Sequence, residues 1–178
     1  MIADLELECE QRLAGIAGRG QALLAPRATI ALVALFRALD LPPGSEVLLP
    51  VALCANPAFA VRWVGLRPVF ADVSPATFNL DLDAAERVVG PQTRVLLAVP
   101  LFGHPLDAPS ITEFARTHNL IIVEDAAQAV GLRYADRPAG SLGVCSVYSF
   151  GPGKIAGDSF NERHERRVKR EIAGDVVQ

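Results

Sequence analysis

The sequence has 178 residues, 51% of them hydrophobic and 21% charged, and its formal net charge is −3. These values are typical of a globular domain with one core, and they do not favour nucleic acid or an acidic membrane as a partner. Three scattered cysteines exclude a disulfide framework, and three histidines without ligand spacing predict no metal site. The acidic N-terminus lacks the basic region of a signal peptide, so we expect a soluble, cytoplasmic protein.

Residues 29 to 150 alternate between short apolar runs and segments with helical patterning. In chain order we expect a helix at 29–39, a strand at 46–49, a helix at 57–64 with Asn56 as its N-cap, a strand at 67–73, a helix at 81–89, a strand at 94–99, a helix at 107–118, and strands at 120–123 and 144–150. Short apolar strands that alternate with helices predict an α/β fold, a three-layer α/β/α domain with a mostly parallel sheet.

The composition changes near the end of the chain. Residues 161–170 carry five of the seventeen lysine and arginine residues and a single apolar residue. Such a segment cannot bury a face, so we expect a solvated helix or a disordered tail, with nucleic-acid binding as an alternative role. The chain is therefore expected to consist of one domain, residues 1–158, and a charged tail, residues 159–178.

Two kinds of side chain that suit chemistry follow predicted strands. Glu124 and Asp125 come directly after a buried strand, and ligands of such sheets bind at the carboxyl ends of the strands. Taken alone, an acid at a strand end that caps the next segment is the simpler interpretation. Lys154, the only lysine before residue 169, stands in the glycine-containing loop SFGPGK, which suits a Schiff-base nucleophile. A P-loop is excluded, because Ile155 follows the lysine and Tyr148 stands where the first glycine would be.

A lysine and a carboxylate together are what pyridoxal phosphate requires. The lysine holds the aldehyde as an imine, and the carboxylate keeps the pyridine nitrogen protonated. The phosphate group needs hydroxyls and free backbone N–H groups, ideally where a helix starts. Ala28 and Thr29 open the first long helix and can supply these groups, and Ser149 can supply another hydroxyl.

Five segments carry a family resemblance in their order along the chain: ATIAL (28–32), RPVFADVSPATFNLD (67–81), PQTRVLLAVPLFGHP (91–105), IIVEDAAQAVG (121–131) and RPAGSLGVCSVYSFGPGK (137–154). From about residue 20 to residue 158 the sequence resembles the DegT/DnrJ/StrS family of sugar aminotransferases. Five ordered motifs are a far more specific signal than a lone glycine pattern.

The resemblance implies the large domain of a pyridoxal-phosphate-dependent transferase of fold type I (aspartate aminotransferase-like), and it implies a homodimer. Lys154 would be the imine lysine, Asp125 would pair with the pyridine nitrogen, and Gln128 would contact the ring or its phenolic oxygen. Three residues would hold the phosphate: Ser149, Ala28 and Thr29.

The resemblance also implies a reaction. The substrate would be a nucleotide-linked keto sugar and the donor an amino acid, usually glutamate, in sugar or polysaccharide biosynthesis. A branch of the family with histidine in place of the lysine performs dehydration, and Lys154 argues against that branch. The family's chains are longer, so we expect this sequence to lack their smaller C-terminal domain. A truncated, non-catalytic remnant that keeps the fold or only the cofactor pocket, or another fold-type-I activity such as a lyase, stays open.

One position departs from the family pattern. The family usually has an aromatic residue that stacks on the cofactor after the strand at 46–49, and Cys54 falls about there. A small core residue is the alternative interpretation of Cys54.

Overall fold

The computed structural model describes residues 2–151 and residue 154. Its main sheet has the strand order β2-β1-β3-β4-β7, and every neighbouring pair is parallel. The strands are β1 (Glu46–Pro50), β2 (Arg67–Ala71), β3 (Thr93–Ala98), β4 (Ile121–Asp125) and β7 (Cys145–Val147). The predicted parallel sheet is therefore confirmed, with strand ends shifted by up to a few residues.

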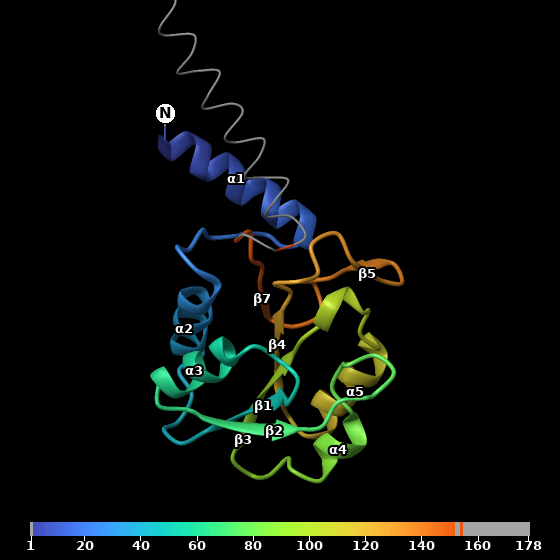
Figure 1. The fold of residues 1–178 in the computed structure, drawn as a ribbon. Coiled ribbons are helices and arrows are strands. Elements are labelled where there is room, and N and C mark those ends of the chain that lie inside the picture. Colours follow the sequence, from blue (N-terminus) through green and yellow to red (C-terminus); the bar gives the residue numbers. More distant parts are fainter. Residues whose placement is uncertain (1, 152–153, 155–178) are drawn as a thin grey trace, which may run out of the picture.

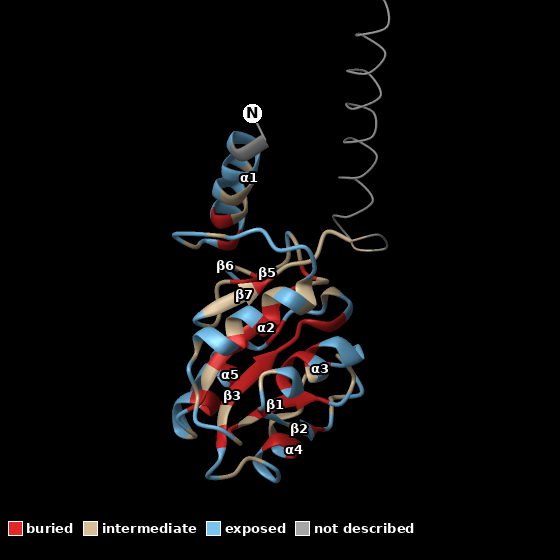
Figure 2. Ribbon diagram, turned by 90° about the vertical axis from the view of Figure 1, so that its left-hand side faces the viewer, coloured by how far each residue is buried: buried red, intermediate tan, exposed pale blue. Residues whose placement is uncertain are grey.

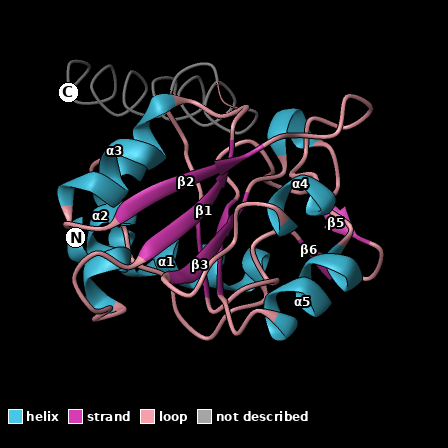
Figure 3. Cartoon of the chain, turned by 90° about the horizontal axis from the view of Figure 1, so that it is seen from below, coloured by secondary structure: helices cyan, strands magenta, loops and turns pink. Residues whose placement is uncertain are grey.

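Helices cover both faces of this sheet. One face packs against α2 (Ala28–Ala38) and α3 (Ala55–Trp63), and the other against α4 (Leu82–Glu86) and α5 (Ala108–Thr117), as Figures 1 and 3 show. This arrangement confirms the three-layer α/β/α prediction.

The core consists of two layers because side chains alternate along each strand. In β1, Val47 and Leu49 join the cluster under α2 and α3, whereas Leu48 joins the cluster under α4 and α5. All three are fully buried, and the red interior in Figure 2 follows the sheet. Burial of a leucine side chain contributes roughly 1.5–3 kcal/mol, so strands that are apolar on both faces are stable only between two helical layers.

Side-chain caps set the starts of two helices. Asp81 accepts hydrogen bonds from Asp83 N at 2.9 Å and Ala84 N at 3.1 Å, and Asp107 accepts one from Ser110 N at 3.2 Å. The helices predicted at 81–89 and 107–118 are thus confirmed, although α4 ends earlier than expected.

The predicted start of α3 is wrong. The helix begins at Ala55 with Cys54 as its N-cap, so Asn56 lies inside the first turn and Pro57 is the third helical residue. The N–H groups of a first turn have no helical partner, so proline is tolerated there as well as at the first position.

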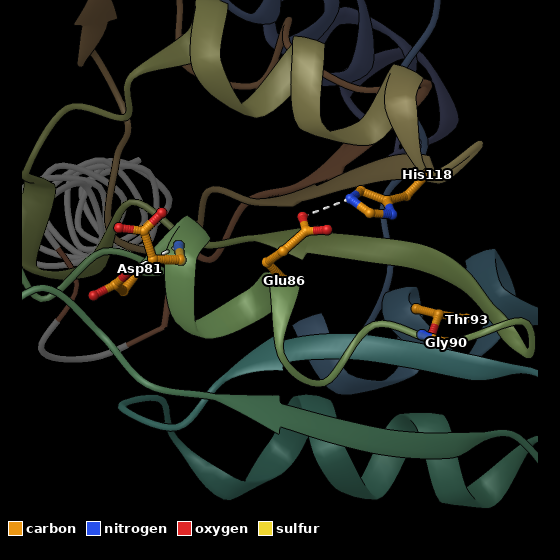
Figure 4. A network of polar contacts seen from close by, with 6 residues as sticks. Asp81, Glu86, Gly90, Thr93 and His118 are labelled. Carbon is orange, nitrogen blue, oxygen red and sulfur yellow. Dashed lines mark hydrogen bonds and ion pairs between the residues drawn. The ribbon is translucent and has the colours of Figure 1, made fainter.

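Several polar contacts lie at the amino edge of the sheet, where β1 and β3 begin (Figure 4). Thr93 Oγ1 accepts a hydrogen bond from Gly90 N at 3.0 Å and donates one to Glu46 at 3.0 Å. His118, the C-cap of α5, lies 2.8 Å from Glu86 of α4. The first contact joins two strands of the sheet, and the second joins two helices of the same layer.

Two features of the structure were not predicted from the sequence. Helix α1 (Ile2–Ala17) stands clear of the sheet in Figure 1, and a small hairpin pairs β5 (Arg133–Tyr134) with β6 (Arg137–Pro138). Arg19, just after α1, donates hydrogen bonds to the carbonyl oxygens of Gly140 and Gly143. None of the described helices has the length and hydropathy needed to cross a bilayer. The tail expected at 159–178 lies outside the described residues.

Candidate active site at the carboxyl edge of the sheet

Glu124 and Asp125 end β4, and their surroundings differ. Glu124 is fully buried and accepts three hydrogen bonds, from Tyr134 Oη at 2.6 Å, Gly140 N at 2.6 Å and Leu142 N at 3.0 Å. This carboxylate fixes the segment that leads into β7. Its donors lie 10 to 18 residues further along the chain, so Glu124 does not cap the next segment locally, and the local contact of this kind is the one from Ala127 N to Asp125.

Asp125 is also buried, but its described partners are fewer. Its Oδ1 accepts a hydrogen bond from Ala127 N at 3.1 Å. Burial raises the pKa of Asp125, and the Ala127 N–H and the Lys154 ammonium offset this effect only in part. A buried carboxyl group with a raised pKa at a strand end is a candidate for a functional role.

Lys154 lies close to this carboxyl group. Its ammonium acts on the pKa of Asp125, and its backbone N–H donates to the Gly151 carbonyl at 3.2 Å. The pairing of β4 with β7 places Asp125 opposite Val147, so the segment after β7 carries the half-buried Ser149 past the same edge. Lys154 is thus near enough for its charge to lower the pKa of Asp125, although the two residues are 29 positions apart in the chain, counted from 125 to 154.

Gln128 belongs to the turn that follows Asp125. Its Oε1 accepts a hydrogen bond from Phe102 N at 3.0 Å. Phe102 follows β3 and has a left-handed backbone, with φ of 54°. Its exposed ring meets the ring of Phe78 edge-on, at 5.9 Å between centroids. The sequence analysis missed this pair, although Pro100 and Gly103 around Phe102 signal a turn.

The start of α2 carries no side-chain cap. Its N-cap is Arg27, whose carbonyl accepts from Ile30 N and Ala31 N at 3.0 Å. A short connection joins the end of α2 to β1, so α2 runs antiparallel to the strand and starts at the carboxyl edge. Figure 1 shows the segment before α2 and the segment after β7 on the same side of the sheet. The N–H groups of Ala28 and Thr29 therefore lie where a helix start attracts an anion.

Cys54 is exposed, so its interpretation as a core residue is wrong. It follows β1 at the point where the chain order of the strands reverses, since β2 lies on one side of β1 and β3 on the other. Ligands of open α/β sheets bind in the crevice at such a point. Cys54 and Phe102 follow β1 and β3, the two strands at this switch point.

A cavity of about 480 Å³ lies between α5 and the β5–β6 hairpin, and Asp107, Thr112, Tyr134 and Arg137 are among its lining residues. None of the predicted site residues lines it, so we do not assign it to the candidate site. Within the described part of the chain, no three histidine, cysteine or acidic side chains are grouped to hold a metal ion.

The fold and the site define an α/β protein that carries a buried acid and a nearby lysine at the carboxyl edge of a parallel sheet. The chain belongs to the DegT/DnrJ/EryC1/StrS aminotransferase family, whose model matches residues 4–157. The family resemblance of the five sequence motifs is thereby confirmed.

Relatives support this assignment. A GDP-perosamine synthase from Caulobacter vibrioides is 38% identical over 149 residues, which are 84% of this chain and 40% of that protein. The crystal structure of DesI with its TDP-sugar product has a TM-score of 0.80 and 41% identity, over 85% of this chain and 38% of DesI. The PLP form of the sugar aminotransferase Spr1654 from Streptococcus pneumoniae has a TM-score of 0.77 and 27% identity, over 84% and 42% of the two chains. The fold is therefore that of these transferases, and the chain spans about 40% of their length.

Proposed function

We propose that this chain forms the cofactor-binding region of a pyridoxal-phosphate-dependent aminotransferase that acts on a nucleotide-linked keto sugar. The observation that carries the proposal is the buried Asp125 with Lys154 nearby at the carboxyl edge. Membership of an aminotransferase family and the pyridoxal-phosphate form of one structural relative support the choice of cofactor.

The residues at this edge fit that cofactor. The described residues supply one hydrogen bond to the buried Asp125 carboxylate, and a protonated pyridine nitrogen would supply a further hydrogen bond and a positive charge. Asp125 would hold that proton on the nitrogen. When bound, pyridoxal phosphate supplies an electron sink for the carbon atom that gains or loses the amino group.

The phosphate group would lie at the start of α2. Ala28 and Thr29 offer backbone N–H groups without a side-chain cap, and Thr29 and Ser149 add hydroxyls. The positive end of the helix dipole would stabilise a bound phosphate there by roughly 0.3–1 kcal/mol. Gln128 would donate its amide N–H to the phenolic oxygen of the ring.

Lys154 has two tasks in this proposal. Its Nζ would hold the cofactor's aldehyde covalently until the amino donor arrives, and would then move a proton to and from the reacting carbon. Its half-buried position near Asp125 would keep the side chain close to the ring. The presence of lysine supports transamination over the dehydration that the family's histidine branch performs.

The substrate class follows from the relatives. One is named for a GDP-linked sugar and another was solved with a TDP-sugar, so we propose a sugar nucleotide without assigning the base. We further propose glutamate as the amino donor and a homodimer as the assembly, as the family resemblance implies. The setting would be sugar or polysaccharide biosynthesis in the cytoplasm.

A half-reaction tests this proposal. Excess glutamate is added to the purified chain loaded with pyridoxal phosphate, and the cofactor is released with acid and separated by chromatography. The proposal predicts that pyridoxamine phosphate appears, and that a Lys154→Ala variant yields none. Cofactor uptake without conversion would support the second candidate, a non-catalytic remnant that keeps the pocket, and no uptake at all would refute both.

A further inference from the structure

Asn79 is a buried side chain that joins two loops at the carboxyl edge of the sheet. It ends the turn after β2, and its Nδ2 donates to the carbonyl oxygens of His104 at 3.4 Å and Pro105 at 2.9 Å. Those two carbonyls belong to the turn that follows β3 and contains Phe102. One amide thus holds together two turns that lie 25 residues apart in sequence.

The same amide leaves one of its atoms unpaired. Asn79 Oδ1 is buried and has no hydrogen-bond partner among the residues that the structure describes. An unpaired buried acceptor is unfavourable, and folded proteins contain few of them. Both hydrogen bonds donated by the Asn79 amide are therefore made while its oxygen stays unpaired. This indicates that the two bonds to the turn after β3 are important for the conformation of that turn.

Each of the two turns contains a residue with a strained backbone conformation, which surrounding contacts must stabilise. Phe78 and Phe102 have φ of 58° and 54°, in the left-handed region that aromatic residues seldom adopt. Strained residues of this kind persist where the surroundings fix them, and they concentrate at ligand-binding sites. Here the contact between the two rings and the hydrogen bonds of Asn79 provide that fixation.

The conformation of Phe102 decides the orientation of Gln128. The Phe102 N–H can only donate, so the end of the Gln128 amide that faces it, at 3.0 Å, is the oxygen. The other end is therefore the NH2 group, which can only donate. A phenolic oxygen in its ionised form is an acceptor, so this orientation is the productive one for a ligand with such a group.

We propose that Asn79 is a positioning residue for Gln128. By holding the turn after β3, Asn79 fixes the Phe102 N–H, and this N–H orients the Gln128 amide so that its NH2 group is presented to the phenolic oxygen of pyridoxal phosphate. The inference deepens the proposed function and rests on it for the identity of the ligand.

Amide hydrogen exchange of the chain without cofactor tests the hydrogen-bond chain itself. Asn79→Ala and Gln128→Ala should each speed exchange of the Phe102 N–H by on the order of tenfold, because each removes one link that protects it. Thr93→Val is the control, since it removes a buried hydroxyl at the opposite edge of the sheet and should leave this amide unchanged. Unchanged exchange in Asn79→Ala would overturn the proposal. If that variant does not fold, Asn79→Leu keeps a similar volume, has neither donors nor a charge, and repeats the test.

A double-mutant cycle on cofactor affinity tests the consequence. Each single alanine variant should weaken pyridoxal phosphate binding by roughly tenfold, the loss expected for one hydrogen bond. The double variant should bind as weakly as Gln128→Ala alone, because Asn79 acts through Gln128. Effects that multiply would overturn the role of Asn79 and leave that of Gln128. If the unaltered chain takes up no pyridoxal phosphate, the proposed function is overturned together with this inference.

Discussion

Glu124 and Asp125 are consecutive in β4, yet the regions that surround them are built in opposite ways. The region of Glu124 satisfies the carboxylate with a tyrosine hydroxyl and two backbone N–H groups. The region of Asp125 buries the carboxyl group and gives it one backbone N–H and a nearby ammonium. The first arrangement stabilises the fold, and we propose that the second leaves interactions to be made by a ligand. On that proposal, adjacent acids of the same strand would serve structure and binding separately.

The largest expected effect is that of Glu124→Ala on stability. The substitution leaves three buried donors without their acceptor, and each such donor costs about 1–3 kcal/mol. We expect a loss of about 5 kcal/mol in the free energy of unfolding, measured by urea denaturation. Glu113→Gln, on the exposed face of α5, is the control and should change nothing measurable. A loss below about 1 kcal/mol in Glu124→Ala would mean that its region is not a structural network.

Asp125→Asn, in contrast to Glu124→Ala, should weaken cofactor binding without lowering stability. We expect cofactor affinity to fall by about 3 kcal/mol, within the range seen when one partner of a buried charge pair is removed. Without cofactor the same variant should be at least as stable as the unaltered chain, because a buried charge with few partners is gone. Asp136→Asn changes the net charge equally in the exposed β5–β6 turn and is the control. A variant that keeps full affinity would contradict the pairing with the pyridine nitrogen.

The pH dependence of stability provides a smaller and independent test. Since burial raises the pKa of Asp125 in the folded chain above its usual value near 4, the folded state binds more protons than the unfolded state between the two pKa values. This contribution makes the cofactor-free chain less stable as pH rises from about 4 through the folded pKa. The contribution of Asp125 is isolated by measuring the free energy of unfolding against pH for both proteins and subtracting the values of Asp125→Asn from those of the unaltered chain. A difference that rises with pH would contradict a raised pKa of Asp125.

Cys54→Tyr should have the smallest effect. Cys54 is exposed after β1, about where the family resemblance implies an aromatic residue that stacks on the cofactor. An added ring that stacks there should strengthen pyridoxal phosphate binding by about 1 kcal/mol, measured by fluorescence titration. Cys54→Ser removes the thiol without adding a ring and should leave affinity unchanged. Weaker binding in Cys54→Tyr would show that the crevice is arranged differently at this position.

Much of the fold could be predicted from local sequence. The strands at β3 and β4 are continuous apolar runs, and the caps Asp81 and Asp107 mark helix starts by their own chemistry. The start of α3 could not be predicted in the same way, because its N-cap, Cys54, makes no side-chain capping bond.

The candidate site likewise combines residues that the sequence predicts with contacts that it does not. Asp125 and Lys154 stand out because a strand end and a lone lysine are visible in the sequence. The contacts from Asn79 to the second turn and from Phe102 to Gln128 join residues 25 or more positions apart, and no local pattern encodes them. The separate role of Glu124 also depends on its distant donors, so the sequence alone could not distinguish it from Asp125.

The most direct test of the account is where the cofactor attaches. The purified chain is incubated with pyridoxal phosphate, reduced with borohydride and digested, and the labelled peptide is identified by mass spectrometry. We expect a label on Lys154, present in Glu113→Gln and reduced in Asp125→Asn. A label on the other lysine, Lys169, or no label under conditions in which the chain is folded, would contradict the assignment of Lys154 and with it the proposed active site.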